Sequence, residues 1–229
     1  MPYNQDQASA YGTIPFAGSS YEVSLLPALR TLGDLAGMAV LDFGAGTGRT
    51  ALALRAQGAG LVVGVDISRT MLSAAQAADG VHYLQVGTAL PLRDAALDAA
   101  ICANVLCEYS ALEAIEQSCR EIARVLRTGA PFVAVVTNPG SVRADYLSYR
   151  YLPIRPLTSG DKVTCRIKGA DPFEITDYYW TRQDYLHAIR AAGFTIVDVL
   201  EPVADPADGV PWLDEKTIAP DLVIHTIRR

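Results

Sequence analysis

The sequence has little of what organises a metal site or a disulfide framework. Its 229 residues include four cysteines and three histidines. The cysteines are Cys102, Cys107, Cys119 and Cys165; they form no C-x-x-C pair, and the histidines are scattered. The sequence therefore predicts no metal site, and it predicts buried thiols in a reducing compartment.

Long apolar runs and an excess of positive charge are also missing. No apolar stretch is long enough to span a membrane, and residues 1–12 lack the charged start and the apolar core of a signal peptide. The formal net charge is −6, which provides no general surface for nucleic-acid phosphates. We therefore expect a cytoplasmic protein with a small-molecule substrate and with neither nucleic acid nor membrane as partner. The oligomeric state is left open.

Apolar residues, in contrast, are plentiful. Half of the chain is hydrophobic, which excludes a disordered protein. A length of 229 residues suits a single domain over residues 1–229 with a sizeable core.

Residues 39–50, AVLDFGAGTGRT, predict the unit around which the rest of the chain is arranged. An apolar run at 40–43 predicts a buried strand, and glycines follow at positions 44, 46 and 48. Glycine allows positive φ and lets a ligand approach the backbone closely. Helix-forming residues begin directly after the turn, so free backbone N–H groups lie beside the glycines. This pattern is typical of the first strand, ligand-binding loop and helix of a nucleotide-type fold.

Two kinds of ligand compete for this loop. A dinucleotide site requires the pattern G-x-G-x-x-G, with a small residue where this chain has the bulky Arg49. Asp42, two residues before the first glycine, would repel a pyrophosphate and attract a cationic amine or sulfonium. The loop therefore favours a zwitterionic ligand.

A second predicted strand, at residues 61–66, ends in Asp66. A carboxylate at this distance from the glycine loop can accept two hydrogen bonds from the vicinal hydroxyls of a ribose. The D-x-G-x-G-x-G pattern that begins at Asp42, together with Asp66, resembles the class I S-adenosylmethionine (SAM)-dependent methyltransferases. The resemblance covers most of residues 40–136 and returns near the C-terminus. It implies SAM as the cofactor and S-adenosylhomocysteine as its product.

The resemblance also implies an α/β fold, a doubly wound and mostly parallel seven-stranded sheet with helices on both faces. Further strands are predicted at residues 81–86, 96–103, 131–137, 194–200 and 222–227. Helices are predicted at residues 21–32, 69–78 and 112–126 and after Thr181. In the family, the last strand lies antiparallel between the fifth and the sixth.

The same resemblance assigns the cofactor contacts residue by residue. Ile67 and Met71 match family positions that line the adenine pocket, although a core role for Met71 is equally open. Thr88 stands where the family usually has an aspartate, so the backbone of Ala89 is expected to carry more of the adenine contact. The predicted cofactor-binding residues are Asp42, Gly44, Ala45, Gly46, Asp66, Ile67, Met71, Thr88, Ala89, Leu90, Asn104 and Val105.

After the fourth strand the family commonly has the pattern N-x-x-x-H, whereas this chain has Asn104 followed by Glu108 at the histidine position. This replaces a near-neutral base by a carboxylate. Glu108 is the predicted base for an acceptor that loses a proton, and Tyr109 is expected to orient that acceptor. The alternative is a structural carboxylate at the strand end.

Residues 138–180 form an insertion rich in tyrosine, proline and glycine, in which 163–168 and 173–179 predict a hairpin. Insertions at this point form the substrate lid in the family, so Tyr178, Tyr179 and Trp180 are expected to line an apolar acceptor pocket. For each of them, packing of the insertion onto the sheet is the alternative.

Two other segments are expected near the acceptor. Residues 1–36 contain a polar arm, residues 1–20, and the first helix; in the arm, Tyr11 and Phe16 are expected to order over the bound ligand, with a frayed terminus as the alternative. Residues 202–220, which include Trp212, predict a loop that forms another wall of the acceptor site.

Three functions follow. The favoured one is an enzyme that transfers a methyl group from SAM to N or O of a small aromatic or heteroaromatic metabolite of specialised metabolism, by in-line displacement without a metal. The second is a SAM-binding enzyme that uses the cofactor for cyclisation or other non-methylating chemistry. The third is a nicotinamide-dependent reductase, which Arg49 disfavours.

Overall fold

The computed structural model describes residues 4–14 and 17–229. None of the helices within those residues is both long and apolar enough to cross a membrane. The elements are, in chain order, α1 (Gln5–Thr13), α2 (Ser20–Thr31), β1 (Ala39–Phe43), α3 (Arg49–Ala56), β2 (Leu61–Asp66), α4 (Arg69–Ser73), β3 (Val81–Gln85), β4 (Ala99–Ala103), η1 (Leu106–Glu108), α5 (Leu112–Val125), β5 (Pro131–Thr137), η2 (Pro139–Ser141), β6 (Tyr149–Tyr151), β7 (Lys162–Ile167), β8 (Phe173–Tyr178), α6 (Arg182–Ala191), β9 (Phe194–Leu200), η3 (Asp214–Lys216) and β10 (Asp221–Arg228).

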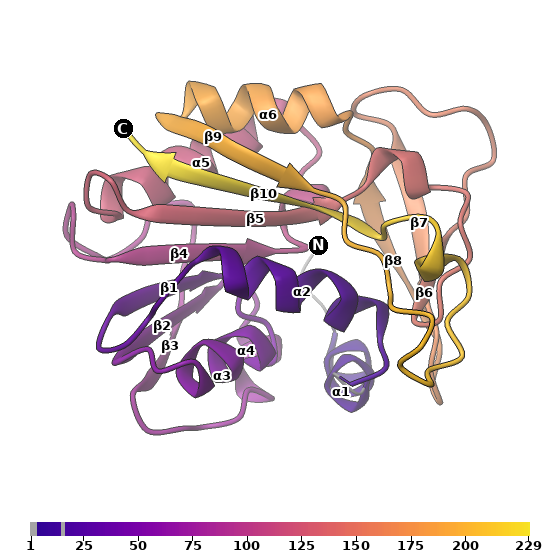
Figure 1. The fold of residues 1–229 in the computed structure, drawn as a ribbon, viewed down its shortest axis with the longest axis horizontal. Coiled ribbons are helices and arrows are strands. Elements are labelled where there is room, and N and C mark those ends of the chain that lie inside the picture. The colour runs from indigo at the N-terminus through magenta and orange to yellow at the C-terminus, as the bar shows by residue number, and fades with distance from the viewer. Residues whose placement is uncertain (1–3, 15–16) are drawn as a thin grey trace.

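A seven-stranded sheet forms the centre of the molecule, in the order β3-β2-β1-β4-β5-β10-β9 (Figure 1). The neighbours from β3 to β5 pair in parallel, and β10 is antiparallel to both β5 and β9. The predicted doubly wound sheet with an antiparallel last strand is therefore confirmed. The strand order reverses between β1 and β4, which is where open parallel sheets bind ligands, outside the carboxyl ends of their strands.

Side chains of the strands fill two cores, one on each face of the sheet. Val40 of β1 lies in a core that includes Leu25 of α2 and Leu54 of α3. The next residue, Leu41, lies in a core that includes Ile115 of α5 and Ile189 of α6. Successive residues of a strand point to opposite faces of the sheet. Because both faces are covered here, consecutive strand residues are apolar and do not alternate with polar ones.

A second sheet, of the three strands β6, β7 and β8, lies beyond the carboxyl ends of the parallel strands (Figure 1). β7 and β8 form the predicted antiparallel hairpin, and β6 adds to the edge of β7. Its buried side chains, among them Tyr151, Val163 and Cys165, form a separate small core. The insertion therefore caps the end of the main sheet at which a ligand is expected.

Two segments differ from the prediction. Residues 1–20 predict an irregular arm, whereas residues 5–13 form helix α1, which begins with a capping box. In that box, the side chain of Asn4 accepts from the Gln7 N–H at 2.8 Å, and the side chain of Gln7 accepts from the Asn4 N–H at 3.1 Å. Helix α4 ends at Ser73, earlier than predicted, and the Gln76 carbonyl beyond it accepts from the hydroxyl of Tyr83 at 3.2 Å. In both segments local hydrogen bonds determine the backbone conformation, because the apolar residues form only a weak pattern.

Candidate active site

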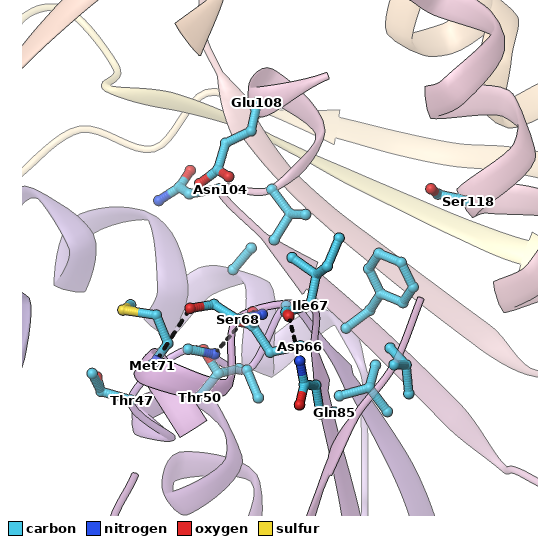
Figure 2. Close-up of a pocket in the computed structure, with 18 of the residues that line it drawn as sticks. Thr47, Thr50, Asp66, Ile67, Ser68, Met71, Gln85, Asn104, Glu108 and Ser118 are labelled. Carbon is cyan, nitrogen blue, oxygen red and sulfur yellow. Dashed lines mark hydrogen bonds between the residues drawn. The ribbon is translucent and has the colours of Figure 1, made fainter. Parts of the chain in front are cut away.

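A cavity of about 650 Å³ lies at the carboxyl ends of β1, β2 and β4. This volume is within the range of about 300–1,000 Å³ that is typical of small-molecule sites. Figure 2 shows Asp66 and Met71 on one side of this space and Asn104 and Glu108 on the other. Helix α1 adds Tyr11 to the lining. The fold thus brings residues that are far apart in the sequence to one cavity.

Backbone conformation and crowding require glycine in the turn after β1. Gly44 has a φ of +81°, and a Cβ at this position would clash with the side chain of Val105. Gly48, the N-cap of α3, has a φ of +86°, and a Cβ there would clash with the hydroxyl of Tyr83. Both glycines are therefore required by the shape of the turn, and Gly44 and Gly46, which line the cavity, leave room for a ligand against the backbone.

Asp66 ends β2, and two backbone groups hold its carboxylate in place. Its Oδ2 accepts from the N–H of Gly46 at 2.8 Å, and its Oδ1 accepts from the N–H of Ser68 at 2.7 Å. Burial raises the pKa of Asp66, and these hydrogen bonds oppose that effect. Each carboxylate oxygen can accept more than one hydrogen bond, so the side chain can also receive two donors from a diol in the cavity.

Asp42 precedes the first glycine of the turn by two residues, and it is absent from the described residues that line the cavity. It is 1% exposed, and its Oδ2 has no hydrogen-bond partner within the described chain. Burial, together with the negative charge of Asp66, raises the pKa of Asp42 to about 7. A ligand in the cavity would therefore interact with Asp42 through its charge and not through a direct contact.

The opposite wall begins where β4 ends. Asn104 has a φ of +56°, a left-handed conformation that is strained for a residue with a Cβ. Glu108, at the end of η1, and Tyr109 follow in the lining, and the side chains of Glu108 and Asn104 lie near each other in Figure 2. The hydroxyl of Tyr109 accepts from Ser118 at 2.8 Å, and burial raises the pKa of Tyr109 to about 12. Tyr109 is therefore neutral at physiological pH.

Further lining residues come from the turns after β2 and β3. Ile67, after β2, is 71% exposed, and Thr88, in the chain segment after β3, is also part of the lining. The side chain of Gln85 donates to the carbonyl of Ile67 at 3.2 Å, as Figure 2 shows. An exposed apolar side chain of this kind at a cavity is suited to a flat ligand surface.

Ala89 and Leu90 are described residues that lie outside the cavity lining, which differs from the prediction. Leu90 is buried in the core, where its N–H donates to Glu121 at 3.0 Å and its carbonyl accepts from Arg124 at 3.0 Å. Hydrogen bonds to side chains of α5 therefore hold this segment in the core and away from the cavity.

The aromatic residues of the insertion also differ from the prediction. Of the described residues that line the cavity, none comes from 178–180. Tyr178, Tyr179 and Trp180 instead border a separate hollow of about 10 Å³, the space of a single water molecule. Trp180 is 7% exposed, and its Nε1 donates to the carbonyl of Tyr109 at 3.0 Å. These side chains pack the insertion onto the sheet, which aromatic composition alone leaves open.

Of the other predicted acceptor contacts, Tyr11 lines the cavity, and Phe16 is outside the described residues. The loop at 202–220 contributes none of the described lining residues. Trp212 in this loop is 4% exposed, packs with Val23 and donates to Asp208 through its Nε1. The loop is thus anchored on α2 and not at the cavity.

Several lining residues escaped the sequence analysis. Tyr21 reaches the cavity from α2, and its hydroxyl shares a hydrogen bond with the hydroxyl of Thr50. Arg49 and Ser118 line the cavity as well. Residue type gave no signal for Tyr21 because only the position of α2 over the glycine turn brings it to the site. Within the described chain, no group of three or more His, Cys, Asp or Glu side chains could hold a metal ion.

Comparison with known proteins agrees with this architecture. The family described as "Methyltransferase domain" matches residues 41–134. The N-demethylindolmycin N-methyltransferase of Streptomyces griseus is 31% identical over 182 residues, which cover 75% of this chain and 76% of that protein. The CcbJ methyltransferase from Streptomyces caelestis shares the fold, with a TM-score of 0.71 over 99% of both chains at 20% identity.

A further solved structure is the 1,6-didemethyltoxoflavin-N1-methyltransferase of Burkholderia thailandensis, with 1,6-didemethyltoxoflavin and S-adenosylhomocysteine bound. Its TM-score is 0.57, its identity 20%, and the match covers 90% of this chain and 78% of that one. The chain belongs to the class I SAM-dependent methyltransferases. It is a methyltransferase, and SAM is its cofactor.

Proposed function

We propose that this enzyme methylates a nitrogen atom of a small, planar metabolite that binds between Glu108, Tyr109 and Tyr11. One observation carries most weight: the glycine turn, Asp66 and Glu108 all border the same cavity of about 650 Å³. A cofactor and an acceptor must share one enclosed space for an in-line displacement, because the reacting atoms have to be aligned at near-contact distance.

Within this cavity, the ribose of the cofactor is assigned to Asp66, whose two oxygens are already oriented by Gly46 and Ser68. The methionine part is assigned to the bare turn at 44–46 and to the end of β4 at Asn104 and Val105. The cationic sulfonium and ammonium groups then come close to the buried charge of Asp42, which favours them.

The adenine is assigned to the space between Ile67 and Thr88, with Met71 at its edge. The side chain of Gln85, next to Ile67, is a further polar group in this region. Because Ala89 and Leu90 lie outside the lining, their predicted part in the adenine contact passes to Thr88 and Gln85.

SAM supplies a methyl group that is already activated on a sulfonium. The acceptor nitrogen contributes the electron pair of the new N–C bond, and the old C–S bond breaks to leave a neutral thioether. We assign to Glu108 the uptake of the proton that the nitrogen loses and to Tyr109 the orientation of the acceptor, because both line the cavity. The aromatic contact between Tyr11 and Phe173, with ring centroids 6.0 Å apart, connects α1 with the insertion, to which we assign the role of a substrate lid.

The choice of nitrogen and of a planar acceptor is supported by the relatives. The relative with 31% identity is named as an N-methyltransferase, and the structure from Burkholderia thailandensis contains the acceptor of an N1-methyltransferase. The rings of Tyr11 and Tyr109 line the part of the cavity assigned to the acceptor, and flat aromatic surfaces of this kind suit a planar ligand.

A turnover screen tests this function. The purified enzyme is incubated with SAM and a set of heteroaromatic amines and matched phenols, and products are analysed by mass spectrometry. We expect S-adenosylhomocysteine together with a nitrogen compound that gains one methyl group. Methylation of the phenols alone would contradict the assignment to nitrogen. A product formed without loss of the methyl group of SAM would indicate non-methylating chemistry.

A further inference from the structure

Arg49 lines the cavity directly after the glycine turn and has no role in the assignments above. Two aromatic rings hold its side chain: its Cζ lies 5.5 Å from the ring centroid of Tyr11 and 5.9 Å from that of Tyr21. Its Nη2 also donates to the backbone carbonyl of Tyr11. A guanidinium has five N–H donors, so this arrangement fixes the group while leaving donors for another acceptor.

Arg49 has no acidic partner among the residues that the structure describes. Of the ion pairs that the described residues form, none includes Arg49, although its side chain is half-buried. A fixed, partly desolvated guanidinium is well suited to a carboxylate, because charge-assisted hydrogen bonds strengthen away from water.

The other charged residues of the lining indicate which anion this is. Asp66 and Glu108 repel a carboxylate, and Arg69 is exposed on α4, two residues after Ile67, to which the adenine is assigned. With the ribose at Asp66 and the adenine at Ile67 and Thr88, the methionine part passes along the glycine turn. Arg49 is the cationic group at that end of the described lining.

We propose that Arg49 binds the carboxylate of the methionine part of SAM and, through the Tyr11 carbonyl, couples helix α1 to the bound cofactor. This inference rests on the cofactor placement proposed above. It also assigns a task to α1, which contacts the insertion through Tyr11 and Phe173 and through a hydrogen bond from the Gln7 side chain to the Glu174 carbonyl at 3.3 Å. Binding of a carboxylate to Arg49 therefore stabilises α1 in its position against the cavity and the insertion.

Isothermal titration with SAM and with decarboxylated SAM tests the proposal, because the two ligands differ only in the carboxylate. We expect Arg49→Gln to weaken SAM binding about 10- to 100-fold, the effect of losing charge-assisted hydrogen bonds. Binding of decarboxylated SAM should weaken by less than about threefold. Arg30→Gln removes an equal charge from an exposed position of α2 and is the matched control, with both affinities unchanged within about twofold.

An equal loss of affinity for both ligands in Arg49→Gln would overturn the carboxylate assignment and leave Arg49 only a structural role toward α1. Unchanged SAM binding in a folded Arg49→Gln variant would overturn it as well. If the unmodified enzyme bound neither ligand, the proposed cofactor site itself would be wrong. These results separate the failure of this inference from the failure of the proposed function.

Discussion

Two groups of buried or partly buried carboxylates lie at the same end of the sheet, in different surroundings. Asp42 and Asp66 lie at the glycine turn, beside a cavity of about 650 Å³. Asp177, in β8 of the insertion, and Asp221, at the start of β10, are buried in the region where the insertion packs on the main sheet, and the hollow bordered by Tyr151 and Tyr178 there is about 10 Å³. Burial raises the pKa in both groups, to about 7 for Asp42 and Asp221 and about 6 for Asp177.

The difference between these regions is one of space and not of residue type. Asp177 accepts a hydrogen bond from Tyr151 at 2.6 Å, and Tyr151 borders the small hollow together with Tyr178, Tyr179 and Trp180. Such a setting resembles a ligand pocket in composition, yet the side chains fill it. Exposed backbone and open volume at the ends of β1 and β2 therefore distinguish the candidate ligand site from the filled region around Asp177. The predictions below test this division between the two regions.

Asp66→Ala should have the largest effect. It would remove the two charge-assisted hydrogen bonds that we assign to the ribose, so SAM affinity should fall about 10²- to 10⁴-fold. Isothermal titration measures this loss. Asp177→Asn is the control from the other region, and its SAM affinity should stay within about twofold. A comparable loss in both variants would contradict the division.

Glu108→Gln should slow the reaction without weakening cofactor binding. Loss of a general base typically costs about 10²- to 10⁴-fold in rate, and the lower end is expected here because an amine nitrogen is already nucleophilic. Single-turnover kinetics give the rate, and titration gives the SAM affinity, which should stay within about twofold. An unchanged rate would indicate that Glu108 is a structural carboxylate.

Asp177 should affect stability and its dependence on pH. Its folded pKa is raised above the unfolded value of 3.8, so its contribution to stability is fully present below pH 3.8 and is lost as the pH rises through about 6. For Asp177 this loss is about 2 kcal/mol between pH 4 and pH 8, and the Tm should fall by several degrees. In Asp177→Asn the fall should be smaller, as thermal unfolding across this range will measure. An identical pH profile would contradict the raised pKa.

Asp42 should produce the smallest effect, a pH dependence of cofactor binding. Because cationic groups of SAM favour the ionised carboxylate, binding lowers the pKa of Asp42 from its value of about 7 in the free enzyme. Below pH 7, binding therefore releases a proton, and affinity should rise with pH by at most about tenfold per unit before it levels off. Titrations between pH 5.5 and 8 measure the slope. Asp42→Asn should flatten it.

Much of this fold could be predicted from the sequence because its signals are local. The apolar runs around Val40 and Asp66 need burial on both faces, which only a covered parallel sheet provides. Thr181 and Asp184 form the capping box that starts α6 where predicted. Helix α1 had a readable signal in Asn4 and Gln7, but its polar surface gave no apolar period.

The walls of the site were harder to predict, because they depend on how distant segments meet. Aromatic residues serve packing and binding equally well, and Trp180 faces the sheet because its N–H finds the carbonyl of Tyr109. In the sequence, Arg49 indicates only that the loop is unsuited to a dinucleotide. Its place between Tyr11 and Tyr21 requires α1 and α2 to lie over the glycine turn, which no local pattern specifies.

A crystal structure with S-adenosylhomocysteine bound tests the central claim most directly. The account predicts the two ribose hydroxyls within hydrogen-bonding distance of the Asp66 carboxylate and the amino-acid end of the ligand against residues 44–49. Electron density for the ligand at another place, such as the region of Tyr178 and Trp180 under the insertion, would contradict it.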